Sequence, residues 1–205
     1  MVVSIDKSIK ACIFDMGGVI LVYPDAKVQK AVHSISAQNV PEELKQLDIG
    51  AISIEDIISS SDKDSQVHKF FAGGNTDDLI KSLIRDANFE KCIEVLKTNN
   101  IKTALLTNNF FIDKEKTRTT IMSDVSVFDV VVESCRVGLR KPDAAIYQLA
   151  LDKLGLQGNE CIFVDDLKMN CDGAEVLGIR AVHVDGGNSE NAVNEIGEIL
   201  GLSIL

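Results

Sequence analysis

The chain has 205 residues, of which 45% are hydrophobic and 25% charged, and its formal net charge is −10. This composition is typical of a globular domain with a sizeable apolar core, and it excludes an intrinsically disordered chain. The acidic balance, without a Lys/Arg-rich stripe, argues against a nucleic-acid partner. An anionic substrate would therefore need a local positive centre, such as a metal ion or one placed lysine.

The spacing of the cysteines and the length of the apolar runs indicate the cellular compartment. The five cysteines are scattered and none forms a C-x-x-C pair, which predicts free thiols in a reducing compartment and no zinc site. The first ten residues lack a signal-peptide pattern, and no apolar run approaches the length of about 18 residues that a membrane span needs. We expect a cytoplasmic protein without a membrane partner.

Short apolar runs alternate with helical segments along most of the chain. Each run is continuous rather than alternating, as in strands buried on both faces, and the runs are 10–15, 101–107, 128–133, 161–165 and 180–184. Apolar residues at helical spacing mark the segments 89–97, 144–154, 169–177 and 190–200, the last three of which stop at a glycine. The alternation predicts an α/β fold with a doubly wound parallel sheet and helices on both faces.

Residues 23–85 break this alternation, because they contain no convincing buried strand. Helical patches instead follow one another with polar joints between them, at 28–35, 42–47, 54–60, 67–71 and 77–84. We therefore expect two parts: a core made of residues 1–22 and 86–205, and a small helical cap inserted at 23–85.

Polar side chains follow the predicted strands, where ligands bind in doubly wound sheets. Carboxylates suit Mg²⁺, a hydroxyl beside backbone amides suits phosphate oxygens, and a lysine supplies a point charge. The side chains in question are Asp15, Thr107, Asn108, Lys141, Asp165 and Asp166. An aspartate beside a metal ion can attack phosphorus, so this set predicts phosphoryl transfer through Asp15.

Four of these segments resemble, in order, the motifs of the haloacid dehalogenase (HAD) superfamily. Residues 14–20 (FDMGGVI) resemble motif I, 106–108 (LTN) motif II, 141–142 (KP) motif III, and 163–170 (FVDDLKMN) motif IV. Residues 133–138 (ESCRVG), with the KPD run that begins at the third motif, are further similar to the N-terminal phosphatase domain of soluble epoxide hydrolase. The resemblance covers essentially the whole chain and implies a HAD-like Rossmannoid core with a helical cap.

Carried over position by position, the resemblance implies a Mg²⁺ site, a phosphoryl site and a small phosphorylated substrate. Asp15 would be the nucleophile, and Lys141 would neutralise charge during the reaction. The implied positions are, for the metal, Asp15, the backbone carbonyl of Gly17, Asp166 and its neighbour Asp165; for the phosphoryl group, Thr107, the amide of Asn108 and Lys141; and, around the metal ligands, Asn170.

Gly17 departs from the family pattern. Phosphatases of the family carry a second aspartate two residues after the nucleophile, which protonates the leaving group and then activates water. Glycine has no side chain to relay a proton, and the loss of a positioned acid/base costs on the order of 10²–10⁴ in rate. We expect weakened hydrolysis, poorest for alkyl phosphates and best preserved for acyl or aryl phosphates.

The gap at Gly17 leaves other functions open. One is a catalytically inactive binding or regulatory protein that keeps the fold. Another is a homodimer whose partner lends an acid. A dehalogenase is disfavoured, because that branch of the family has a tyrosine at this position and needs no metal.

Side chains elsewhere are candidates for a substitute acid: Tyr23, Asp25, His33 and His68. We expect the third histidine, His183, to be packed within a strand.

Overall fold

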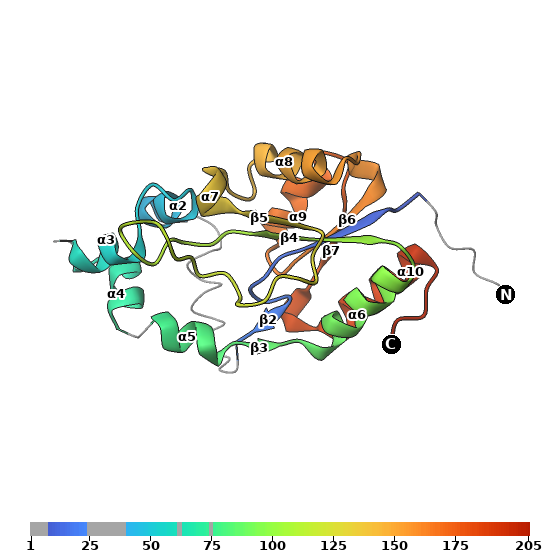
Figure 1. Cartoon of the computed structure of the whole chain (residues 1–205), viewed down its shortest axis with the longest axis horizontal. Helices are drawn as coiled ribbons and strands as arrows, with labels where there is room; N and C mark the ends of the chain where they lie inside the picture. The colour runs from blue at the N-terminus through green and yellow to red at the C-terminus, as the bar shows by residue number, and fades with distance from the viewer. Residues whose placement is uncertain (1–7, 24–39, 61–62, 74–75) are drawn as a thin grey trace.

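A five-stranded parallel sheet runs through the centre of the computed structural model, which describes residues 8–23, 40–60, 63–73 and 76–205 (Figure 1). The strand order is β5-β4-β1-β6-β7. The bounds are Ala11–Phe14 for β1, Lys102–Thr107 for β4, Val130–Glu133 for β5, Cys161–Asp165 for β6 and Arg180–His183 for β7. Every predicted apolar run is therefore a strand, and the doubly wound parallel sheet is confirmed.

Strand β1 lies in the middle of the sheet, and its alternate side chains enter two separate apolar clusters. Cys12 and Phe14 pack in the cluster that contains residues of α6 (Ala87–Thr98) and α10 (Ser189–Leu200). Ala11 and Ile13 pack in the cluster that contains residues of α8 (Ala144–Leu154) and α9 (Lys168–Glu175). Figure 1 shows one helix pair on each face, which explains why the strand sequences are apolar throughout.

Local signals set the ends of these helices. The Asp86 carboxylate accepts hydrogen bonds from the backbone N–H groups of Asn88 and Phe89 and so caps α6. A glycine ends α8 at its C-terminus: Gly155 has φ +69°, a left-handed conformation that glycine adopts readily. The remaining short elements of the core are α7 (Ser134–Val137) and two 3₁₀ turns, η1 (Gly158–Glu160) and η2 (Asp185–Gly187).

Four helices lie beyond the carboxyl ends of the strands, at the left of Figure 1, and we call them the helical group. They are α2 (Glu42–Asp48), α3 (Ile54–Ser59), α4 (Gln66–Ala72) and α5 (Thr76–Ser82). The first three of them share an apolar cluster of their own, made of Leu44, Leu47, Ile54, Ile57, Val67 and Phe71. Four predicted helical patches are confirmed, although the last ends at Ser82 and Ile84 lies in a strand. The patch 28–35 lies outside the described residues, and the division into a core and a 23–85 cap stays a prediction.

A two-stranded antiparallel ribbon joins the helical group to the core, and it was not predicted. Strand β2 (Leu21–Val22) pairs with β3 (Ile84–Arg85), with Leu21 opposite Arg85 and Val22 opposite Ile84. The N–H of Asp86 also donates to the carbonyl of Ile20, at 3.0 Å. The chain therefore leaves the core and returns to it along the same ribbon.

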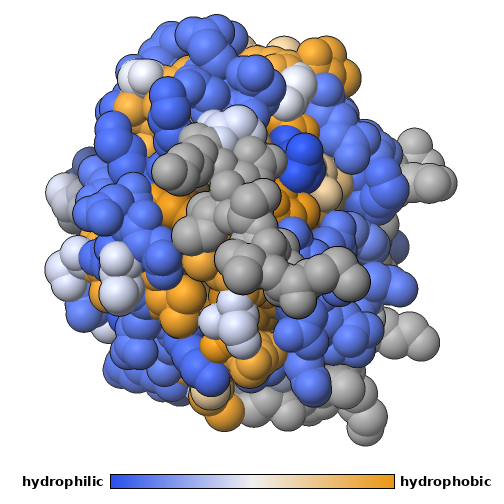
Figure 2. Space-filling view, turned by 90° about the vertical axis from the view of Figure 1, so that its right-hand side faces the viewer, coloured by the Kyte–Doolittle hydropathy of each residue, from blue (hydrophilic) through white to orange (hydrophobic). Residues whose placement is uncertain are grey.

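Among the described residues, no comparable helical layer lies at the opposite end of the molecule (Figure 1). Figure 2 shows that hydrophilic side chains cover most of the described surface there. The five cysteines are all buried free thiols, as expected. Within the described ranges, no helix has the length and apolarity needed to cross a bilayer.

Candidate active site

Lys141 ties together the ends of neighbouring strands. Its ammonium nitrogen lies 2.8 Å from Asp15 Oδ1, just after β1, and 2.7 Å from Asp165 Oδ2, at the end of β6. It also donates to the carbonyl of Leu106 on β4, at 3.1 Å. The side chain is completely buried. The predicted nucleophile, lysine and fourth-motif aspartate are therefore in direct contact.

Asn108 positions the backbone of this lysine. Its side-chain oxygen accepts a hydrogen bond from the N–H of Lys141 at 2.9 Å, and its side-chain nitrogen donates to the carbonyl of Lys141 at 3.1 Å. The side-chain amide is thus engaged with the backbone of the lysine. Thr107, the preceding residue, is buried at the end of β4 and lines the same cavity.

Asp165 is saturated with hydrogen bonds. One carboxylate oxygen accepts from the N–H of Leu167 (2.8 Å) and from the side-chain nitrogen of Asn170 (3.0 Å). The other accepts from Lys141 (2.7 Å) and from the same Asn170 nitrogen (3.1 Å). The geometry makes Asp165 an anchor for Lys141, and Asn170 fixes the orientation of that anchor.

Three buried carboxylates gather at this point. Asp15, Asp165 and Asp166 each offer an oxygen, and these oxygens lie within 4.8 Å of one another. Burial raises the pKa of Asp15 to about 7, and the Asp165 and Asp166 carboxylates add to the effect against the lowering influence of Lys141. Burial lowers the pKa of Lys141, but the Asp15 and Asp165 carboxylates outweigh it and raise that pKa above its usual value. The ammonium thus contacts two of the three clustered carboxylates.

The donor set fits a hard divalent cation. Mg²⁺ prefers carboxylate, carbonyl and water oxygens, and its charge would offset the excess of negative charge in the cluster. Gly18 makes room for this arrangement: it has φ +76°, and a Cβ there would lie only 2.0 Å from Asp166 Oδ2. Asp15, Asp166 and the adjoining glycine backbone are therefore residues that could hold the metal.

A cavity of about 180 Å³ opens above the cluster, between the strand ends and the helical group. The predicted site residues line its polar base: Asp15, Gly17, Thr107, Asn108, Lys141, Asp166 and Asn170. Most of the remaining wall is apolar, and it includes Leu44, Val67, Phe70, Phe71, Leu83 and Phe110. Phe71 packs edge-to-face on Phe70 and on Phe110, with ring centroids 5.1 and 5.7 Å apart.

This apolar wall and an ion pair beside it were missed from the sequence. Arg140 Nε lies 2.8 Å from Asp48 Oδ2, which links the core to α2 of the helical group, and both residues line the cavity. Burial raises the pKa of Asp48 to about 6, although Arg140 opposes the shift. The doubled phenylalanines at 70–71 and 110–111 were the available signal, but nothing in the sequence brings the two pairs together.

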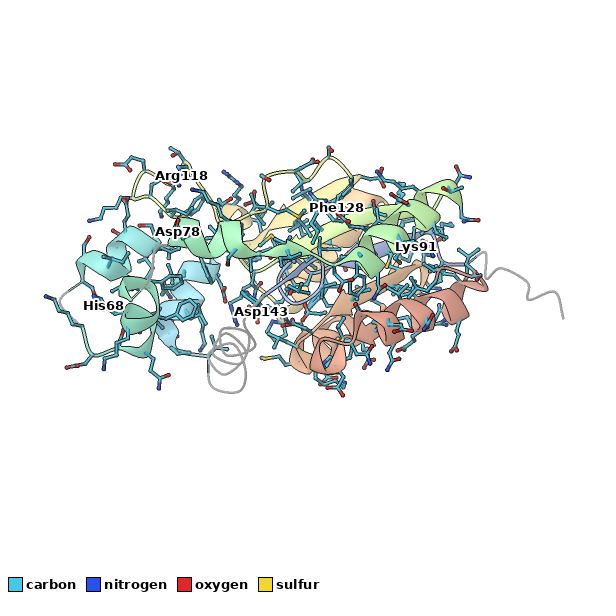
Figure 3. The ribbon with its side chains drawn as sticks, turned by 90° about the horizontal axis from the view of Figure 1, so that it is seen from below. His68, Asp78, Lys91, Arg118, Phe128 and Asp143 are labelled. Carbon is cyan, nitrogen blue, oxygen red and sulfur yellow. The ribbon has the colours of Figure 1, made fainter. Side chains whose placement is uncertain are left out.

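Two of the candidate substitute acids, Tyr23 and His68, are among the described residues. Tyr23 lines the cavity, and its hydroxyl oxygen would be 3.3 Å from a Cβ on Gly17. His68 is buried in α4 and is not among the residues that line the cavity; Figure 3 shows it in the helical group, well separated from Asp143 of the core. Within the described part of the chain, its Nδ1 has no hydrogen-bond partner.

The structure does not place the other two candidates. Asp25 and His33 lie outside the described residues. His183 is half-buried at the end of β7, and its Nε2 lies 3.1 Å from the backbone carbonyl of Asp166. It packs in the strand, as expected.

Residues 9–178 match the family model of haloacid dehalogenase-like hydrolases. The chain belongs to this family. The matched residues include all four motif segments and the whole of the cavity lining described above. The HAD-like α/β fold and the hydrolase family predicted from the motifs are thereby confirmed.

Curated relatives of this HAD hydrolase include larger proteins that it matches only in part. It is 41% identical over 114 residues to mouse acyl-CoA dehydrogenase family member 10, covering 56% of this chain and 10% of that protein. It is 34% identical over 113 residues to pig bifunctional epoxide hydrolase 2, covering 54% and 20% respectively. A sesquiterpene phosphatase from Aspergillus oryzae is 26% identical over 176 residues, covering 85% of this chain and 89% of that protein. Phosphatases are therefore among the relatives.

Solved structures show the same fold. A HAD family enzyme from Bacteroides thetaiotaomicron, in complex with magnesium and inorganic phosphate, superimposes with a TM-score of 0.61 at 20% sequence identity. The alignment covers 87% of this chain and 95% of that one. At this level of identity the likeness concerns the fold alone.

Proposed function

We propose that this HAD hydrolase is a Mg²⁺-dependent phosphatase that hydrolyses phosphomonoesters through an aspartyl-phosphate on Asp15. One observation carries the proposal: a buried carboxylate, paired with a buried lysine, forms the base of a cavity beside a second carboxylate, Asp166. The phosphatases among the relatives support it.

The nucleophile is held by its neighbours. Asp15 Oδ1 accepts a hydrogen bond from the N–H of Met16 at 2.6 Å and lies 2.8 Å from the lysine nitrogen, so the carboxylate has a fixed orientation. A carboxylate oxygen of Asp15 forms the bond to phosphorus as the leaving oxygen departs, and Lys141 neutralises charge on the nucleophile. Thr107 and the backbone amide of Asn108 hold the phosphoryl oxygens.

Asp15, Asp166 and the carbonyl of Gly17 would hold Mg²⁺, which when bound would offset the negative charge of the phosphoryl group. Asp165 contributes charge to the same cluster, but its hydrogen bonds assign it mainly to orienting Lys141. Asn170 acts through Asp165 in the same way.

The substrate we propose is the monophosphate of an apolar alcohol. The cavity has a polar base and a wall formed largely by aliphatic and phenyl side chains, which would bury a hydrocarbon group and leave the phosphate at the carboxylate cluster. A relative named as a sesquiterpene phosphatase supports this choice.

Hydrolysis of p-nitrophenyl phosphate and of an isoprenyl monophosphate, with Mg²⁺ and with EDTA, tests the function. We expect turnover that requires Mg²⁺ and is lost in Asp15→Asn. Asp152→Asn, an exposed carboxylate on α8, is the matched control and should keep full activity. Equal activity in wild type and Asp15→Asn would rule out the proposed nucleophile.

A second candidate is a non-catalytic binding protein that keeps the fold and the metal, and Gly17 is the observation that favours it. In that case the wild type would turn over no phosphomonoester, and Gly17→Asp would create activity. Ordinary rates in the wild type would exclude this second candidate.

A further inference from the structure

The Tyr23 hydroxyl lies beside the position where Gly17 has no side chain. A Cβ built on Gly17 would be 3.3 Å from the Tyr23 hydroxyl oxygen. Tyr23 directly follows β2, and it lines the same cavity as Asp15 and Gly17. A phenol group thus borders the space that the family's second aspartate side chain would occupy.

The surroundings of this phenol make it a hydrogen-bond donor. Burial raises the pKa of Tyr23 above its usual value, and the carboxylates of Asp166 and Asp15 raise it further. The hydroxyl is therefore protonated at neutral pH. The same two carboxylates oppose a phenolate, so the group is suited to donate a hydrogen bond and to keep its proton.

The competing acid in the described cavity lining is already engaged. Asp48 belongs to α2, and its Oδ2 is 2.8 Å from Arg140 Nε. In that ion pair Asp48 is a carboxylate with no proton to donate, and protonating it would break the pair. Tyr23 has the further advantage of position, because it is the residue that a side chain on Gly17 would meet.

We propose that the Tyr23 hydroxyl donates a hydrogen bond to the leaving-group oxygen of the phosphomonoester, in place of the side chain that Gly17 lacks. This inference rests on the phosphatase function proposed above. As a carboxylate oxygen of Asp15 bonds to phosphorus, the phosphorus–oxygen bond of the ester breaks and its electron pair stays on the leaving oxygen. The phenol stabilises that charge.

A water molecule supplies the proton for the leaving group and the hydroxide for the second step. The leaving oxygen takes a proton from a water molecule and departs as the alcohol. The hydroxide that this forms attacks phosphorus and releases phosphate together with the Asp15 carboxylate. Tyr23 ends the cycle with its own proton, so no step requires a phenolate.

Such a donor matters most when the leaving oxygen carries the most charge. In Tyr23→Phe, kcat/KM for an alkyl phosphate should fall on the order of tenfold to a hundredfold, the range typical of one hydrogen bond to a charged oxygen. For p-nitrophenyl phosphate, whose leaving group spreads its charge over the ring, the loss should be less than about threefold. A merely structural tyrosine would affect all esters alike.

The experiment measures kcat/KM for a series of monophosphates whose alcohols have graded pKa values, from p-nitrophenyl to alkyl. The matched control is Tyr147→Phe, the chain's other tyrosine, whose hydroxyl donates to the carbonyl of Asn170 at 2.7 Å. Loss of the Tyr147 hydroxyl should change kcat/KM by the same factor for every ester in the series. Thermal unfolding of each variant verifies that it is folded.

Tyr23→Phe should make kcat/KM depend more steeply on the pKa of the leaving alcohol. Gly17→Asp should make that dependence shallower, and in the Gly17→Asp background Tyr23→Phe should have no further effect on kcat/KM. Parallel plots for wild type and Tyr23→Phe, or no effect of Gly17→Asp, would overturn the role of Tyr23 and leave the phosphatase function intact. No turnover of any ester by the wild type would overturn both.

Discussion

Gly18 offers the sharpest test of the proposed metal site, through substitution by alanine. A Cβ at this position would lie 2.0 Å from Asp166 Oδ2, 2.5 Å from its Cγ and 3.1 Å from its Cβ. Because the overlap extends along the whole side chain, the Asp166 carboxylate has to swing away from the other two. Gly18→Ala should therefore abolish Mg²⁺ binding while leaving the sheet in place.

Backbone strain is separated from this effect by a matched control. Gly178 has the same φ of +76°, and nothing lies within 4 Å of a Cβ built there. Gly178→Ala should lower the free energy of unfolding by about 1–2 kcal/mol, the strain of a left-handed non-glycine residue. Gly18→Ala should lower the free energy of unfolding by at least as much, because it has the same backbone strain and, in addition, the clash with Asp166.

Thermal unfolding in EDTA and in Mg²⁺ measures both quantities. At a Mg²⁺ concentration of 100 times Kd, binding adds about 2.7 kcal/mol, which corresponds to roughly 5–10 °C in Tm for a chain of this size. Wild type and Gly178→Ala should show this rise, and Gly18→Ala should show none. A Mg²⁺-induced rise of equal size in all three proteins would refute the assignment of Asp166 as a ligand.

Three further predictions concern Lys141, Asp48 and Phe70. Lys141→Met leaves buried carboxylates without their ammonium, so urea titrations should show a loss of about 3–5 kcal/mol of unfolding free energy; a loss under about 1 kcal/mol would contradict the buried ion-pair arrangement. The pKa of Asp48 is raised to about 6, so its stabilising contribution is present below about pH 4 and is lost as the pH rises through 6. The unfolding free energy of wild type minus that of Asp48→Asn should accordingly fall by about 2.5 kcal/mol between pH 4 and 7, and a pH-independent difference would count against this. Phe70→Ala should raise KM about tenfold for a long-chain alkyl phosphate and leave a short-chain one unchanged, because only the longer chain reaches the apolar wall; equal changes in KM would argue against that binding mode.

The sheet was predictable because its signal is local. Each strand of the core is a continuous apolar run, since helices cover both faces, and polar residues such as Asp15 and Thr107 mark where the runs end. Parallel strands place those ends at one edge, so Asp15, Thr107 and Asp166 were expected at the same crevice. Lys141 lies between α7 and α8 rather than at a strand end, and its specific role was predicted only with the family resemblance.

The cavity wall and the ribbon were not predictable, because they depend on contacts between distant segments. Phe71 and Phe110 are in contact because α4 packs above the strand ends. No local sequence pattern at either residue predicts this contact. Strands β2 and β3 are two residues each, too short for any periodicity to show. The role of Asp165 likewise depended on its hydrogen bonds, which its position beside Asp166 does not reveal.

The ribbon also has a consequence for how such a protein can change over time. Because Val22 and Ile84 face each other, a short turn between them would close the chain without re-threading the core. Everything between those two residues is therefore a cassette that a gene could lengthen, shorten or exchange. Most residues of the apolar wall lie in this segment, whereas Asp15, Lys141 and Asp166 lie outside it. Tyr23, the first residue of the segment, is the exception, because the proposal above gives it a role at the leaving group. Selection can thus change which substrates fit while the nucleophile, the lysine and the carboxylate cluster stay as they are.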